Sequence, residues 1–156
     1  MALQTYLDKR LYIHRLHEIN FLDYYGRSSK IDFRKVKFIQ EERVIWYRPL
    51  AVHTWFVEHI LGGADIYGEF IVEVEDLQLL RNHCERVLES LVDERYCPEG
   101  GVFEYVDIAE ELIPVKDKKY GLEYFYEIKF TLESLVDVLN EPCPNLYDFI
   151  YGSHDL

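Results

Sequence analysis

The sequence predicts a single α+β domain over residues 1–156, with a small antiparallel sheet packed against about three helices. Three observations favour this class. Apolar and polar residues alternate near the N-terminus, which is typical of a half-buried strand. Three later segments space their apolar residues with helical periodicity, and glycine- and proline-containing loops separate them. A chain of 156 residues can bury enough surface to fold without disulfides or metal ions.

The first half of the chain is predicted to supply two strands. Leu3 to Ile13 has the period-two pattern of a strand, and residues 14–32 are expected to form an irregular connection. Val36 to Tyr47 is rich in β-branched and aromatic residues, so a second β region is expected there. Its polar centre, Gln40 to Arg43, is interpreted either as a hairpin turn or as a short helical loop.

Three helices are predicted from apolar spacing. The first runs from about Pro49 to Leu61, because proline suits the first helical position and Gly62-Gly63 ends the segment. The second spans about Glu75 to Glu94 and the third about Tyr124 to Asn140, with a helical turn expected at 108–113. A short β segment is expected at 66–74. The start of the tail, residues 145–156, is expected to dock on the body of the protein or on a neighbouring subunit.

The charge of the chain is strongly uneven. The net charge is −12, made up of +3 over residues 1–60 and −15 over residues 61–156. Such an acidic chain is not expected to bind nucleic acid or an anionic membrane across its surface. The asymmetry is consistent with a basic pocket inside an acidic shell, and equally with an acidic surface that only favours solubility. No apolar run is long enough to span a membrane, so a cytoplasmic protein is expected.

Cysteine and histidine spacing does not predict a metal site, and no cofactor is expected. The three cysteines, Cys84, Cys97 and Cys143, are odd in number and lack C-x-x-C spacing, so reduced thiols are expected. His53 and His59 are six residues apart and do not share a helix face as an H-x-x-x-H pair would. No nucleotide-binding glycine motif or nucleophile elbow is present, and no catalytic residue is predicted.

The segment from Trp46 to Phe56 is the strongest candidate for a binding site. It holds both tryptophans, an arginine and a histidine at the predicted start of a helix, where unpaired N–H groups attract anions. Arg48 and the helix start near Ala51 are predicted to take phosphate, Trp46, Tyr47 or Trp55 to stack a base, and His53 to hydrogen-bond ribose or phosphate. A core Trp/Phe pair with a surface arginine is the competing interpretation. The predicted ligand-binding residues are Trp46, Tyr47, Arg48, His53 and Trp55.

Three segments resemble a family of small proteins from tailed bacteriophages. Residues 2–10, ALQTYLDKR, are similar to a G-L-D-M-Y-L pattern followed by basic residues, although alanine and glutamine replace its glycine and aspartate. Residues 46–57 resemble W-R-K-A-N-x-I-H-x-W-F-V, with Trp46, His53, Trp55 and Phe56 in register and Tyr47-Arg48 in place of its basic pair. Residues 67–88 resemble C-G-E-Y-Y-V-S followed by a leucine helix.

The resemblance implies a phage accessory role in the host cytoplasm, including counter-defence. The leading hypothesis is a homo-oligomer that binds and sequesters a small nucleotide-derived signal without chemistry. One alternative is an acidic inhibitor that binds a host defence protein through the −15 charge of residues 61–156. The other is a phosphodiesterase-like enzyme that cleaves a nucleotide with His53 and a carboxylate.

Overall fold

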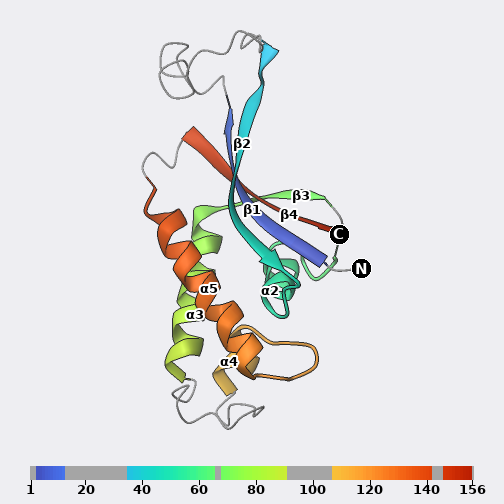
Figure 1. The fold of residues 1–156 in the computed structure, drawn as a ribbon, viewed down its shortest axis with the longest axis vertical. Coiled ribbons are helices and arrows are strands. Elements are labelled where there is room, and N and C mark those ends of the chain that lie inside the picture. Colours follow the sequence, from blue (N-terminus) through green and yellow to red (C-terminus); the bar gives the residue numbers. More distant parts are fainter. Residues whose placement is uncertain (1–2, 13–34, 66–67, 91–106, 142–145, 156) are drawn as a thin grey trace.

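The computed structural model describes residues 3–12, 35–65, 68–90, 107–141 and 146–155 of the chain. It confirms the α+β class. Four strands form one antiparallel sheet in the order β2-β1-β4-β3, and helices pack against it (Figure 1). The predicted connection at 14–32, Cys97 and Cys143 lie outside the described residues.

The two long strands of the first half agree with the sequence pattern. β1 (Leu3–Tyr12) buries Thr5, Leu7 and Leu11, which lie at alternate positions along most of the strand. β2 (Phe38–Tyr47) pairs with β1 along its whole length, so the turn or helical loop expected at Gln40 to Arg43 is wrong. The register shifts by one residue between Leu7 and Asp8, which is the signature of a β-bulge in β2.

The polar centre of β2 is strand because its side chains have partners on neighbouring elements. Gln40 donates to Asp8 Oδ2 at 2.7 Å, and Arg43 forms an ion pair with Glu141, which follows α5 (Leu122–Leu139). Hydrogen bonds and ion pairs of this kind satisfy polar groups that a sequence pattern assigns to a turn.

The remaining strands complete the sheet. β3 (Glu69–Val72) forms the second edge, and β4 (Tyr147–Asp155) lies between β1 and β3. The tail is therefore an inner strand of the sheet, where Tyr147, Phe149 and Tyr151 are buried. The start of the tail was expected to dock on the body or on a neighbouring subunit, and its pairing with β1 and β3 shows that it docks on the body.

Four helices are described. They are α2 (Val52–His59), α3 (Val74–Ser90), α4 (Asp107–Leu112) and α5 (Leu122–Leu139). Figure 1 shows α3 and α5 lying side by side and extending away from the sheet, with α2 near one end of β1 and β2. Leu80 and Cys84 of α3 and Ile128 and Leu135 of α5 are fully buried in the core, as helical spacing predicts. Among the described residues, no helix has the length and apolar character needed to cross a membrane.

Candidate functional site

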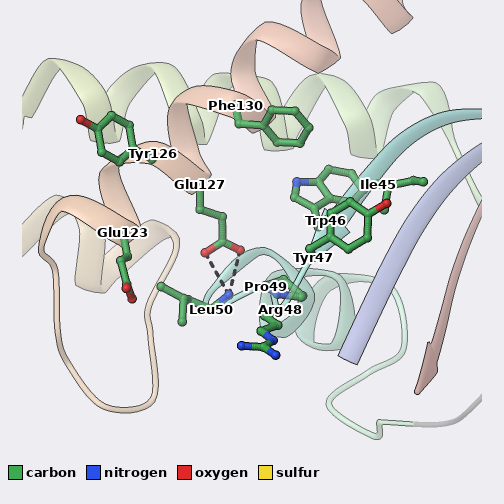
Figure 2. A pocket seen from close by; sticks show the side chains of 10 residues that line it. All are labelled: Ile45, Trp46, Tyr47, Arg48, Pro49, Leu50, Glu123, Tyr126, Glu127 and Phe130. Atoms are coloured by element: carbon green, nitrogen blue, oxygen red, sulfur yellow. Dashed lines mark hydrogen bonds between the residues drawn. The ribbon is translucent and has the colours of Figure 1, made fainter. Parts of the chain in front are cut away.

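A hollow of about 660 Å³ lies where the end of β2 meets the first half of α5. It is lined by two segments, one at the end of β2 and one on α5, which are about 75 residues apart in the sequence. A volume of this size suits a small organic ligand. Figure 2 shows the ten lining residues: Ile45, Trp46, Tyr47, Arg48, Pro49, Leu50, Glu123, Tyr126, Glu127 and Phe130.

Exposed aromatic side chains form much of the wall of the hollow. Tyr47 is 69% exposed, Tyr126 is 53% exposed and Phe130 is 45% exposed. Tyr126 and Phe130 are four residues apart on α5, so they lie on the same side of that helix. Rings that are this accessible can stack on a flat ligand without any rearrangement of the core.

Of the described residues that line the hollow, Arg48 is the only one with a positive charge. It is exposed, and its backbone has φ 53°, a left-handed conformation that a residue with a Cβ seldom adopts. Its N–H donates to the carbonyl oxygen of Leu3 at 2.9 Å, which holds the chain in this conformation. Among the described residues no carboxylate forms an ion pair with its guanidinium, so the group is available to a ligand. Strained backbone of this kind is found preferentially at functional sites.

The start of α2 is already occupied by an internal carboxylate. The Glu127 side chain accepts hydrogen bonds from the N–H groups of Leu50, Ala51 and Val52 at 3.0–3.3 Å. Figure 2 shows the two that come from Leu50. These are the unpaired donors to which a phosphate was predicted to bind. The prediction of a phosphate at the helix start near Ala51 is therefore corrected, because Glu127 saturates that position from α5.

Burial raises the pKa of Glu127, and the three backbone hydrogen bonds oppose that shift. The residue lies on the inward side of α5, between the buried residues Tyr124 and Thr131. That position was the available sequence signal, since a glutamate three residues after one core residue and four before another requires an internal partner.

Trp46 contributes only part of its surface to the hollow. Its indole is 3% exposed, and its N–H donates to Thr131 Oγ1 at 2.9 Å. The ring also packs edge-on against Phe56 at 6.1 Å between centroids. Trp46 is thus a core residue with one edge at the hollow. For this residue, the structure favours the interpretation of a core Trp/Phe pair over that of a stacking platform for a base.

Trp55 and His53 do not line the hollow. Trp55 is 1% exposed, donates to His83 Nδ1 at 3.1 Å and stacks on His59 at 4.3 Å between centroids. Burial lowers the pKa of His83, which favours the neutral ring that accepts this bond. His53 instead forms hydrogen bonds with Tyr151 and Asp65. The distance is 2.7 Å from its Nδ1 to the Tyr151 hydroxyl oxygen and 3.2 Å from its Nε2 to Asp65 Oδ2.

The structure therefore brings together three of the five predicted ligand-binding residues. Trp46, Tyr47 and Arg48 line one hollow, whereas successive positions on α2 turn His53 and Trp55 toward other parts of the molecule. Sequence reasoning missed Tyr126 and Phe130. The signal was present, because both are aromatic residues that fall off the apolar stripe of α5.

A second polar region lies on the sheet face that β1, β2 and β3 share, opposite the buried side chains. We name it the sheet-face cluster; its members are Tyr6, Asp8, Arg10, Gln40 and Glu69. Arg10 donates to Gln40 at 2.8 Å and to Glu69 at 2.5 Å. Burial raises the pKa of Tyr6 to about 12, and the Gln40 hydrogen bond holds the pKa of Glu69 below its usual range.

The described residues contain no group of three or more histidine, cysteine or acidic side chains arranged to hold a metal ion. Cys84 is a core residue, and burial raises the pKa of its thiol. The hollow at the end of β2 therefore remains the strongest candidate site.

Comparison with known proteins identifies no relative of this chain. No protein-family model, curated protein or solved structure matches the chain.

Proposed function

We propose that this protein binds a small nucleotide-derived ligand in the hollow and sequesters it without changing it chemically. The observation that carries the proposal is the combination, around a space of ligand size, of three exposed aromatic rings and an arginine that has no ion-pair partner among the described residues. Tyr47, Tyr126 and Phe130 would stack on the base, and Arg48 would take a phosphate through two parallel N–H donors.

The charge of the lining refines the ligand class. Arg48 is accompanied by two carboxyl groups, Glu123 and Glu127, and Glu127 is occupied by backbone N–H groups. One available cation beside these acids favours a ligand with few phosphate charges over a polyphosphate. Donor groups on a nucleobase edge would suit the exposed Glu123 carboxylate.

The proposal of binding without chemistry rests on the residue types present. The ten lining residues include no histidine, cysteine, serine, threonine or lysine, so they cannot form a Ser–His or Cys–His nucleophile–base pair. His53, the predicted catalytic residue of the enzyme alternative, lies outside the lining with Tyr151 and Asp65 as its partners. The phage counter-defence setting, the host cytoplasm and the alternative of a host protein partner remain predictions from the sequence.

Calorimetry and thermal unfolding with nucleoside monophosphates, cyclic dinucleotides and ADP-ribose test the proposal. A ligand present at 100 times its dissociation constant should stabilise the fold by about 2.7 kcal/mol. Replacing Tyr126 with leucine removes a stacking surface and should weaken binding by about 1–3 kcal/mol. Leu79→Ala is the matched control, since Leu79 is a similarly exposed apolar residue on α3, away from the hollow.

Failure of every ligand to bind the folded protein would overturn the proposal. Equal loss of affinity in Tyr126→Leu and Leu79→Ala would also count against the hollow as the site. Mass spectrometry of the recovered ligand separates sequestration from cleavage, because only an enzyme changes the mass of the ligand.

A further inference from the structure

Exposed apolar side chains are concentrated on the hollow and its rim. Of the eight large apolar residues that are exposed in the described part of the chain, Tyr47, Leu50, Tyr126 and Phe130 line the hollow. A contiguous apolar surface with a polar rim is typical of an interaction site. β2 is also an edge strand of the sheet, and no described strand pairs with its outer side.

Two opposite charges lie on either side of Leu50, along one edge of this surface. Arg48 and Glu123 are both exposed, and neither forms an ion pair with any described residue. Figure 2 shows the Leu50 side chain between the Arg48 guanidinium and the Glu123 carboxylate. Within the described part of the chain, no residue therefore competes with an outside group for either charge.

A two-fold axis converts this arrangement into a self-complementary one. In a symmetric dimer, if residue i of the first copy contacts residue j of the second copy, then residue j of the first copy contacts residue i of the second. An axis that passes beside Leu50 would place each arginine opposite a glutamate at both ends of the contact. The same axis would place apolar rings against apolar rings, which buries the surface that is exposed in a single copy.

We propose that two copies of this chain associate face to face through the hollow. Arg48 pairs with Glu123 of the partner subunit at both ends of the interface, and Leu50 packs near the axis. The partner subunit then covers the open side of the hollow, so a bound ligand is enclosed by both copies. This last step rests on the proposed function, whereas the association itself does not.

Charge reversal tests the pairing directly by sedimentation velocity over a wide range of protein concentration. Arg48→Glu and Glu123→Arg each place like charges opposite one another, so each should weaken self-association at least about tenfold. The double variant restores opposite charges with the positions exchanged and should recover the association of the wild type. Glu89→Arg, at an exposed residue of α3 that does not line the hollow, is the control for the change in net charge and should have no comparable effect.

A wild-type protein that stays monomeric at every concentration overturns the inference. So does a dimer that the single reversals leave intact, or one that the double variant fails to restore. Circular dichroism of each variant verifies the fold. Ligand calorimetry is a separate measurement, so a dimer that binds no nucleotide would reject the proposed function while retaining this interface.

Discussion

Two arginines, Arg48 at the hollow and Arg10 in the sheet-face cluster, have opposite surroundings. Arg10 is bound by Gln40 and Glu69 and lies over the Phe38 ring at 4.3 Å. Arg48 has no ion-pair partner among the described residues, and its backbone is held in a left-handed conformation. The difference indicates that Arg10 supports the sheet, whereas the guanidinium of Arg48 is available for binding.

The largest expected effect concerns two glutamates at the hollow that are four residues apart on α5. Glu127→Ala leaves the N–H groups of Leu50, Ala51 and Val52 without their acceptor, and should lower the free energy of unfolding by about 2–3 kcal/mol. Glu123→Ala should change it by less than about 0.5 kcal/mol, because Glu123 is exposed. Urea unfolding of both variants provides the measurement. Equal losses would show that the α2 start does not depend on Glu127.

The next prediction compares the two arginines directly. Arg10→Leu removes charged hydrogen bonds to Glu69 and Gln40, and should destabilise the fold by about 1–2 kcal/mol. Arg48→Gly relieves the left-handed backbone and should stabilise it by up to about 1 kcal/mol, while ligand affinity falls. Thermal unfolding and calorimetry on both variants measure the two effects. Loss of stability in Arg48→Gly would assign Arg48 a structural role like that of Arg10.

The smallest expected effect is the acid sensitivity of the sheet-face cluster. The pKa of Glu69 is held low in the folded state, mainly by the hydrogen bond from Gln40. Its ionised form therefore contributes stability above its ordinary pKa of about 4.3, and the contribution is lost as pH falls through the folded-state value. Glu69→Gln should lose less stability between neutral pH and acid than the wild type. Identical pH profiles for the two proteins would show that the cluster does not contribute in this way.

Some elements of this fold can be predicted from local sequence patterns, and others cannot. Periodicity located the helices, because Leu80 and Cys84 or Ile128 and Leu135 recur at helical spacing whatever their partners are. It failed at Gln40 to Arg43, where polar residues in a strand are satisfied by Asp8 and Glu141. Those partners lie on β1 and beyond the end of α5, and local pattern carries no information about such distant contacts.

By itself, the sequence determined the α+β class, the order of the main elements and the segment in which a site begins, because strand and helix periods are local properties. Only the tertiary structure decided which parts of that segment reach a ligand. Glu127 comes from about 75 residues away to occupy the start of α2, and Tyr126 and Phe130 come with it on the same helix. The residues of a site are selected by which elements pack together, and that packing depends on the whole chain.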